Sequence, residues 1–498
     1  MKNKTIIIRA DASVKNGTGH VMRCLALAHG LKRAGNGICF AVSECPAPLV
    51  KKIKSNDFSM LRIKSKAGSV KDAVETAKSA MKRKSSWVIT DGYHFSEKYQ
   101  ESIKDSGLKL LFIDDYGHCK NYVADIILNQ NLYAGTHFYH KSGIFTRMLL
   151  GTQYALIRPE FFQYRNWKRE ITEKATRILL TLGGSDPDNT TLKILKALKS
   201  LKFEVKAVIG GSNPHLKSIE REIKKTPNLQ ILKNVSDMPG LMAWADIAIT
   251  SGGSTCWETS FMGLPNIIIY CADNQKPIAI SLDSAGSAIN LGHNRDLTEK
   301  VLVSTIKKLS SDREARSMML EKGRLLVDGR GAERVIYAMN APSLRKAGED
   351  DCRFVWELAN SREVREVSFS QNSIPWETHR EWYGRMMKDK NCFFLIAEDP
   401  EGVKAAQVRF RVNGKDAVIS TSLALEFRGK GYGNMLIAQG SESLFRTTDV
   451  KTIHAYIKPE NKGSVKSFVR AGYCQTDLDS FAIEKNSLHL VMKKSEDS

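Results

Sequence analysis

The feature that most constrains the fold is a glycine-containing segment between an apolar strand and an amphipathic helix near the N-terminus. This segment, residues 11–24 (DASVKNGTGHVMRC), follows a β-branched run and precedes apolar residues at helical spacing. Gly17 and Gly19 allow a sharp turn and a close approach of the backbone to a ligand. Because His20 lies where the helix is expected to begin, the segment predicts a ligand-binding loop above the edge of a sheet. A tight turn that binds nothing is the alternative that the spacing leaves open.

Alternating strand and helix patterns continue through the first two thirds of the chain. Short apolar runs recur with helical or polar stretches between them, and a second set begins near Arg177 with RILLTLGGSDP. This alternation predicts an α/β fold in which helices connect parallel strands. Two such halves indicate a GT-B-like, two-domain glycosyltransferase architecture with two Rossmann-like halves. We expect these halves at residues 1–165 and 166–340, a polar linker at 341–351 and a third domain at 352–498.

Composition argues against several classes of protein. The 498 residues carry a net charge of +21, but Lys and Arg are spread along the chain without interleaved aromatic residues, so we expect no nucleic acid partner. No apolar run is long enough for a membrane span or for the core of a signal peptide. The 9 cysteines include no C-x-x-C pair, which favours a reducing, cytoplasmic setting without a zinc site.

Acidic and aromatic residues follow two of the expected strands. Asp91 and Tyr93 come after the run at 87–90, and Asp115 follows the run at 110–113. Ligands of open parallel sheets collect at the carboxyl ends of strands, so these side chains are expected to face one crevice with the glycine loop. Either carboxylate could instead cap the next helix. We favour a functional role for Asp91 and a capping role for Asp115.

The segment SGGSTCWE, residues 251–258, is the most specific motif of the second half. Gly252 and Gly253 would bring backbone N–H groups to a phosphate at a helix start. Glu258 would then accept hydrogen bonds from a ribose diol. Alternatively, Thr255 and Glu258 fit a capping box that only stabilises the helix start. The preceding glycine pair favours nucleotide binding.

Seven segments, taken in order, resemble a known family. Within residues 5–335 they read DASVKNGTGHVMRCLALA, TDGYHF, IDDY, LNQN, TLGGSDP, TSGGSTCWE and DNQ. They are similar to the nucleotide-sugar hydrolase of pseudaminic acid synthesis, the PseG family. The resemblance implies a glycosyltransferase-like fold that releases UDP from UDP-2,4-diacetamido-2,4,6-trideoxy-β-L-altropyranose by passing the sugar to water, with inversion. It also implies an essential histidine at His20, a functional tyrosine at Tyr93, and a nucleotide pocket at Glu258, Asn274 and Gln275.

The implied hydrolysis requires few catalytic groups. UDP is already a good leaving group, so one base with stabilisation of the diphosphate can replace the two carboxylates of ordinary glycosidases. Histidine titrates near neutral pH, which suits His20 to take a proton from water or to donate to a phosphate oxygen. Backbone N–H groups around Gly183 and Gly252 would stabilise the leaving diphosphate. No cluster at ligand spacing predicts a metal.

The stretch RGKGYG, residues 428–433, opens a helix pattern directly after a strand pattern. With Asn461, Ser464 and the later FVRAGY it resembles the GNAT acetyltransferase family. The resemblance implies backbone N–H groups for the pyrophosphate of acetyl-CoA, a strand with Leu423 and Leu425 that aligns the thioester, and Asn461 near the pantetheine arm. The opening of this region is similar to the branch with the pseudaminic-pathway amino-sugar N-acetyltransferase (PseH-like).

The general acid of this third domain is left unassigned. Many members of the GNAT family carry a tyrosine at the position of Phe468, so Tyr456 and Tyr473 are the alternatives. Glu377 and His379 would lie near the acceptor amine, or they would merely belong to a helix start.

The most economical interpretation is a bifunctional enzyme whose third domain acetylates the 4-amine of a UDP-linked amino sugar before the first two domains hydrolyse off UDP. The alternatives are a UDP-sugar-dependent glycosyltransferase with an accessory acetyltransferase, and a nucleotide-sugar sensor with a protein-acetylating domain. Sugar stereochemistry and oligomeric state stay open. The candidate residues are catalytic His20, Asp91 and Tyr93; substrate- or UDP-binding Gly17, Gly19, Gly183, Gly184, Ser185, Gly252, Gly253, Ser254, Glu258, Asn274 and Gln275; and acetyl-CoA-binding Leu423, Leu425, Arg428, Gly429, Lys430, Gly431, Tyr432, Gly433, Asn461 and Ser464.

Overall fold

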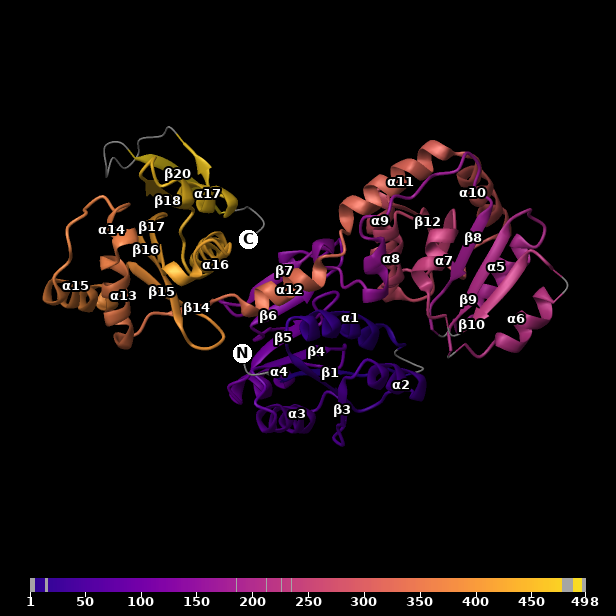
Figure 1. The fold of residues 1–498 in the computed structure, drawn as a ribbon, viewed down its shortest axis with the longest axis horizontal. Coiled ribbons are helices and arrows are strands. Elements are labelled where there is room, and N and C mark those ends of the chain that lie inside the picture. The colour runs from indigo at the N-terminus through magenta and orange to yellow at the C-terminus, as the bar shows by residue number, and fades with distance from the viewer. Residues whose placement is uncertain are drawn as a thin grey trace. The chain divides into compact units, whose positions relative to one another are not determined.

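The computed structural model describes residues 5–13, 17–184, 186–211, 213–224, 226–233, 235–476 and 487–494 (Figure 1). The chain forms two compact units. Unit 1 comprises Met1–Lys141 and Met148–Ile336, and unit 2 comprises Ser142–Arg147 and Tyr337–Ser498. Unit 1 contains two sheets with Rossmann strand order, and unit 2 is built on a third, mostly antiparallel sheet. The α/β fold with two Rossmann-like halves followed by a further domain is thus confirmed.

The first sheet has the strand order β3-β2-β1-β4-β5-β6-β7 and is parallel from β3 to β6. Its strands are rich in β-branched residues and buried, as is typical of a parallel sheet covered on both faces. The order reverses between β1 and β4, so the loops after these two strands lie side by side at the carboxyl edge. The elements are β1 (Thr5–Ala10), α1 (Gly19–Arg33), β2 (Gly37–Val42), α2 (Ala47–Ser55), β3 (Ser59–Arg62), α3 (Val70–Lys82), β4 (Trp87–Asp91), α4 (Glu97–Asp105), β5 (Lys109–Ile113), β6 (Ile126–Asn129), η1 (Thr136–Phe138), β7 (Arg147–Leu150), η2 (Thr152–Tyr154) and η3 (Pro159–Tyr164).

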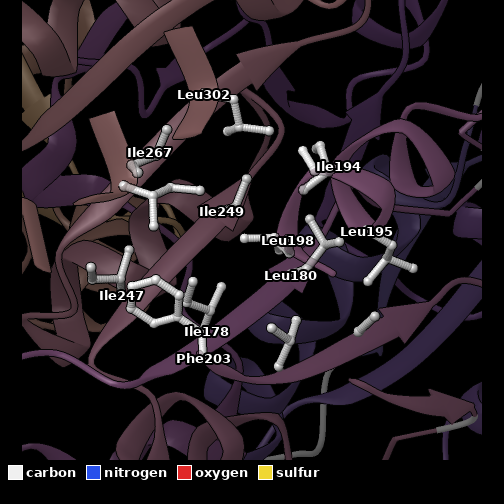
Figure 2. Close-up of a cluster of buried hydrophobic side chains, with 14 of the residues drawn as sticks. Ile178, Leu180, Ile194, Leu195, Leu198, Phe203, Ile247, Ile249, Ile267 and Leu302 are labelled. Atoms are coloured by element: carbon white, nitrogen blue, oxygen red, sulfur yellow. The ribbon is translucent and has the colours of Figure 1, made fainter. Parts of the chain in front are cut away.

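The second sheet repeats this order as β10-β9-β8-β11-β12-β13, with parallel pairing throughout. Its switch point lies between β8 and β11, which places the two glycine motifs of this half at neighbouring strand ends. Figure 2 shows the apolar side chains of β8, β11 and β12 packed with those of α5 and α10. The elements are β8 (Arg177–Thr181), α5 (Thr190–Leu198), β9 (Glu204–Ile209), α6 (Leu216–Ile223), β10 (Leu229–Lys233), α7 (Met238–Trp244), β11 (Ile247–Thr250), α8 (Thr255–Met262), β12 (Asn266–Tyr270), η4 (Asp273–Gln275), α9 (Lys276–Ser284), β13 (Ala288–His293), α10 (Glu299–Ser311), α11 (Arg313–Leu326) and α12 (Gly331–Asn340).

The third sheet has the order β14-β15-β16-β17-β18-β20-β19. Among its described strands, only β17 and β18 pair in parallel. Their three paired positions end at Val418 and His454, so the two strands separate towards their carboxyl ends. The elements are β14 (Ser343–Lys346), η5 (Glu349–Asp351), α13 (Cys352–Asn360), α14 (Arg362–Arg365), α15 (Trp376–Lys388), β15 (Cys392–Glu398), β16 (Lys404–Asn413), β17 (Asp416–Leu423), η6 (Leu425–Phe427), α16 (Tyr432–Thr447), β18 (Thr452–Ile457), α17 (Lys462–Arg470), β19 (Cys474–Gln475) and β20 (Leu488–Lys493).

Two segments of unit 2 differ from the sequence expectation. Residues 341–351, expected to be a linker, contain β14, which pairs antiparallel with β15 and so forms the edge of the third sheet. Polar residues suit an exposed edge strand, which is why the composition resembled a linker. Residues 142–147 also belong to unit 2, where Phe145 packs against the core and its carbonyl accepts a hydrogen bond from Gln439 (2.8 Å).

Candidate active sites

A buried ion-pair cluster surrounds the histidine of the first glycine loop. Gly17 adopts a φ of 71°, a conformation that favours glycine, and α1 begins two residues later. His20 therefore lies in the first turn of α1, and its Nδ1 is 2.7 Å from Oδ1 of Asp91 at the end of β4. The His20 side chain is 13% exposed and that of Asp91 is fully buried. The structure thus brings two predicted catalytic residues into direct contact.

Arg23, one turn after His20, joins this pair to a second carboxylate. Its Nε and Nη2 donate to Asp91 at 2.6 and 2.7 Å, and Nη1 and Nη2 donate to Asp115 at 2.7 and 3.0 Å. Burial alone would raise the pKa of Asp91, but the guanidinium and His20 outweigh it and hold that pKa well below its usual range. With two carboxylates facing one guanidinium, a proton accepted by His20 brings the cluster to charge balance.

The sequence expectation for Asp115 was wrong. Asp115 does not cap a helix; it accepts hydrogen bonds from Arg23, from Asn131 (2.9 Å) and from Tyr93 (2.8 Å). The local capping is done by its neighbour Asp114, whose carboxylate accepts the backbone N–H groups of the next three residues. A sequence of two adjacent aspartates does not reveal which of them points into the sheet edge.

Tyr93 is held beside His20 by both halves of unit 1. Its ring meets the His20 imidazole edge-on at a centroid distance of 4.8 Å, and its hydroxyl donates to Asp115. Burial and the Asp115 charge raise the pKa of Tyr93, so the phenol stays protonated, while Asn274 of the second half hydrogen-bonds the same oxygen. A predicted catalytic residue and a predicted UDP-pocket residue are therefore in contact.

The glycine motifs of the second half present unpaired backbone amides. At the start of α8 no described group accepts from the N–H of Gly252 or Ser254, and no side chain caps the helix. A Cβ on Gly252 would lie 2.5 Å from the Gln275 carbonyl oxygen, so only glycine fits there. Gly184 lies close to the first half, since a Cβ on it would be 3.8 Å from Thr18 Oγ1. Ser185 lies outside the described residues.

The Glu258 carboxylate is paired with Arg158, the residue that directly precedes the 3-10 turn η3. Nε and Nη2 of Arg158 donate to its two carboxylate oxygens at 2.6 and 2.9 Å, and the residue is 7% exposed. The capping-box alternative is not formed, because Ser254 rather than Thr255 is the N-cap and makes no side-chain cap. Gln275 accepts from the Cys271 N–H (2.9 Å), so its side-chain oxygen is already used.

Neither a metal cluster nor a membrane helix is found in the part of the chain that the structure describes. There, no group of three or more His, Cys, Asp and Glu side chains could hold a metal ion. None of the described helices is both long and apolar enough to cross a bilayer.

The glycine turn of unit 2 has the features of a pyrophosphate site. Gly429 and Gly431 adopt φ values of 73° and 78°, and α16 starts directly afterwards without a side-chain cap. The backbone N–H groups from Gly429 to Gly433 have no hydrogen-bond partner among the described residues, so they are free to bind an anion. The residues present therefore fit the pyrophosphate of acetyl-CoA. Tyr337 supports the turn: its hydroxyl donates to the Lys430 carbonyl (2.7 Å), and its ring stacks on Tyr432.

The remaining predictions for unit 2 meet different outcomes. Leu423 ends β17, but Leu425, expected on the same strand, lies in the 3-10 turn η6 and is 58% exposed, because the chain turns after Leu423. Asn461 is the N-cap of α17, and its side chain accepts from the Ser464 N–H (3.1 Å). These contacts give Asn461 a structural role whether or not it also touches a ligand.

The two candidate general acids lie in different surroundings, and so do the two residues expected near the acceptor amine. The Tyr473 hydroxyl is buried against Ser441 (2.8 Å), whereas Tyr456 stacks on His489 at a centroid distance of 4.7 Å. Glu377 is 64% exposed and pairs with Arg380, as a surface residue does. His379, in contrast, is 2% exposed within an aromatic cluster.

Arg23 and Arg158 are the important residues that sequence reasoning missed. Arg23 lies three residues after His20 and interrupts a row of apolar residues on the buried face of α1. A charged residue on such a face signals a buried partner, because an unpaired buried charge is costly. Arg158 carries no comparable signal, since it follows a loop.

Comparisons with known proteins agree with this division. Residues 178–329 match the model of the glycosyltransferase family 28 C-terminal domain, and residues 343–473 match that of the acetyltransferase (GNAT) domain. An uncharacterized protein of Methanocaldococcus jannaschii is 25% identical over 496 residues, covering 95% of this chain and 97% of that protein.

Two further relatives match the first part of the chain. The spore coat polysaccharide biosynthesis protein SpsG of Bacillus subtilis is 27% identical, covering 66% of this chain and 95% of that protein. The UDP-2,4-diacetamido-2,4,6-trideoxy-beta-L-altropyranose hydrolase of Campylobacter jejuni is 28% identical, covering 56% of this chain and 97% of that protein. The chain therefore joins a PseG-like part to a GNAT acetyltransferase domain.

Proposed function

We propose that unit 1 hydrolyses UDP-2,4-diacetamido-2,4,6-trideoxy-β-L-altropyranose to UDP and 2,4-diacetamido-2,4,6-trideoxy-L-altrose, in pseudaminic acid biosynthesis. Unit 2 transfers the acetyl group of acetyl-CoA to the 4-amine of the UDP-linked amino-sugar precursor. The similarity to the Campylobacter jejuni hydrolase and the match to the GNAT model support the two halves of this proposal.

The contact between His20 and Asp91 carries the hydrolase proposal. Asp91 accepts from Nδ1, which leaves Nε2 with its lone pair directed away from the carboxylate. In the proposed reaction Nε2 takes a proton from water, the water oxygen bonds to the anomeric carbon, and the bond from that carbon to the UDP oxygen breaks. The paired carboxylates of Asp91 and Asp115 then stabilise the imidazolium, as a buried aspartate does for the histidine of a catalytic triad.

Two further groups assist the departure of UDP. The unpaired N–H groups of Gly252 and Ser254 at the start of α8 stabilise the diphosphate charge. Glu258, oriented by Arg158, accepts hydrogen bonds from the ribose hydroxyls. Tyr93, in contact with both His20 and Asn274, binds the sugar between the two loops.

In unit 2 the amine nitrogen attacks the thioester carbon and the carbon–sulfur bond breaks; the nitrogen loses one proton, and the departing thiolate takes up one proton to leave as the CoA thiol. The free N–H groups from Gly429 to Gly433 hold the pyrophosphate of acetyl-CoA, and the strand ending at Leu423 aligns the thioester. Mass spectrometry of the full chain with acetyl-CoA and the UDP-linked 4-amino sugar tests this half; no acetylated sugar would contradict it.

Hydrolysis in H₂¹⁸O tests the first half. We expect ¹⁸O in the sugar rather than in UDP, and a loss of about 10²–10⁴-fold in UDP release by His20→Ala, which still binds UDP. His29→Ala on the same helix is the matched control and retains activity. Near-native turnover by His20→Ala would remove His20 from the mechanism.

A UDP-sugar-dependent glycosyltransferase is the second candidate, favoured by the match of residues 178–329 to a glycosyltransferase domain. The two functions differ in the acceptor. UDP release in buffer without any acceptor sugar supports the hydrolase, and release that depends on an added sugar or lipid acceptor supports the transferase.

A further inference from the structure

One face of the third sheet carries an arginine without an anionic partner. Arg409 lies on β16, partly buried, with its guanidinium 4.7 Å from the ring centroid of Trp382 and 5.8 Å from that of Phe394. Among the described residues it forms these cation–π contacts but no hydrogen bond and no ion pair. Cation–π contacts recover part of the lost hydration of an arginine, but they leave its five donors unused.

In the part of the chain that the structure describes, no carboxylate pairs with Arg409. Burial is the main cause that lowers the pKa of Arg409; Cys392 acts in the opposite direction, and the neighbouring Arg411 lowers the pKa further. Arg9 and Arg23, also buried, each face two carboxylates. A desolvated guanidinium that the protein itself does not neutralise is suited to an anion supplied by a ligand.

Two buried hydrogen-bond acceptors lie near this arginine. Gln407, two residues earlier on the same face of β16, is 7% exposed, and its Oε1 has no hydrogen-bond partner among the described residues. His379 contacts the same Trp382 ring at a centroid distance of 5.1 Å. One of its ring nitrogens bonds the backbone of Cys352, whereas Nε2 is buried without a described partner. Burial lowers the pKa of His379, so Nε2 carries a lone pair.

These groups adjoin the strand that is proposed to align the thioester. Gln407 pairs with Ser422 and Arg409 with Ser420 on β17, whose last residue is Leu423. The opposite face of β16, with Val408 and Phe410, points into the main core of unit 2. The polar groups therefore lie on the face that α13 and α15 cover through a separate, smaller apolar cluster.

We propose that Arg409, Gln407 and His379 form the acceptor subsite of the acetyltransferase, and that its acceptor is an amine that carries an anionic group. The subsite rests on the proposed function of unit 2 and names the residues that bind the anionic part of its acceptor. The guanidinium binds phosphate oxygens of a nucleotide-linked amino sugar, bidentately where geometry allows, while Gln407 and His379 accept from its N–H and O–H groups. A polycationic amine would be repelled by the same arginine.

Acceptor kinetics of Arg409→Gln test the subsite. We compare the UDP-linked 4-amino sugar with the methyl glycoside of the same amino sugar, which lacks the diphosphate. The substitution is expected to raise KM for the UDP-linked acceptor by about 10–100-fold at nearly constant kcat, and to change KM for the glycoside by less than about 2-fold. Arg411→Gln, the same charge change two residues along the strand, is the matched control.

The outcomes separate the subsite from the proposed function. Equal effects of Arg409→Gln on both acceptors, or a preference of the wild type for spermidine, would overturn the subsite even if the UDP-linked sugar is acetylated. No acetylation of that sugar by the wild type contradicts the proposed function instead. If Arg409→Gln does not fold, the wild type can be tested instead with UDP as an inhibitor of methyl glycoside acetylation. Competitive inhibition by UDP supports the subsite, and no inhibition counts against it.

Discussion

The two arginine-centred clusters of this chain differ in what balances the guanidinium charge. Arg23 in unit 1 donates four hydrogen bonds to two carboxylates, so its charge and its donors are satisfied within the protein. Arg409 in unit 2 faces the rings of Trp382 and Phe394 instead. When all charges of a cluster are paired within the protein, which we call a closed cluster, it holds neighbouring groups in place, here His20 and Tyr93. When a buried charge lacks a protein partner, which we call an open cluster, a ligand can supply that partner. The difference assigns a positioning role to Arg23 and a binding role to Arg409.

Asp91→Asn is expected to have the largest effect, because it opens the closed cluster. The substitution removes one of the two charges that compensate Arg23 and loses the anion beside His20 Nδ1. We expect UDP release to fall by about 10²–10⁴-fold and the unfolding free energy to fall by about 1.5–3 kcal/mol, because charge-assisted hydrogen bonds are lost while Asp115 still neutralises Arg23. UDP-release assays and urea unfolding measure both quantities. Asp105→Asn at the exposed end of α4 is the control, and a stable, active Asp91→Asn would contradict the closed-cluster interpretation.

A partly buried histidine in unit 1, His118, and a buried one in unit 2, His379, sharpen the comparison through the pH dependence of stability. Burial by itself would lower the pKa of each histidine. For His118 in unit 1, the hydrogen bond and the charge of Asp114 outweigh burial and raise the pKa to about 10. A raised pKa gives stability that is complete below about pH 6.5 and is lost as pH rises towards 10, about 1.5–3 kcal/mol in all. No described carboxylate acts on His379 in this way.

Urea unfolding midpoints of unit 1 between pH 6.5 and 10 measure this loss. His118→Gln is expected to flatten the dependence in that range, and His137→Gln, an exposed histidine nearby, to leave it unchanged. An unchanged slope in His118→Gln would show that other groups carry the dependence.

Glu258→Gln tests whether the Glu258 carboxylate, already paired with Arg158, also binds the ribose of UDP. Arg158 contacts both Glu258 and Glu160, so each carboxylate can be neutralised while the other stays. Calorimetry is expected to show UDP affinity about 10-fold weaker for Glu258→Gln, because a charge-assisted hydrogen bond to the ribose is lost, and within about 2-fold of wild type for Glu160→Gln. Equal effects would indicate that only the pairing with Arg158 matters.

Tyr337→Phe is expected to have the smallest effect, a weaker binding of acetyl-CoA at the glycine turn of residues 429–433. The variant keeps the ring stacked on Tyr432 and loses only the hydrogen bond to the Lys430 carbonyl. We expect KM for acetyl-CoA to rise by about 2–5-fold with the acceptor KM unchanged, the equivalent of one neutral hydrogen bond. A change confined to the acceptor KM would contradict this positioning role.

The architecture and the glycine turns could be predicted from local sequence patterns. Strand–glycine–helix motifs are contiguous in the sequence. The turns at Gly17, Gly252 and Gly431 and the succession of two Rossmann-like halves and a third domain along the chain therefore follow from local patterns. The sequence also placed His20 at a helix start. Because an edge strand exposes polar residues, the same local pattern failed for β14, which looked like a linker.

The pairing of the buried charges could not be predicted from the sequence, because the partners are far apart along the chain. Arg23 finds its carboxylates 68 and 92 residues away, and Arg158 finds Glu258 100 residues away, through strand ends that the fold brings together. The tertiary structure also distinguished Asp115 from Asp114, and paired Arg23 from unpaired Arg409. The physical reason is that the cost of a buried charge depends on its neighbours in space, which residue type and spacing along the chain do not specify.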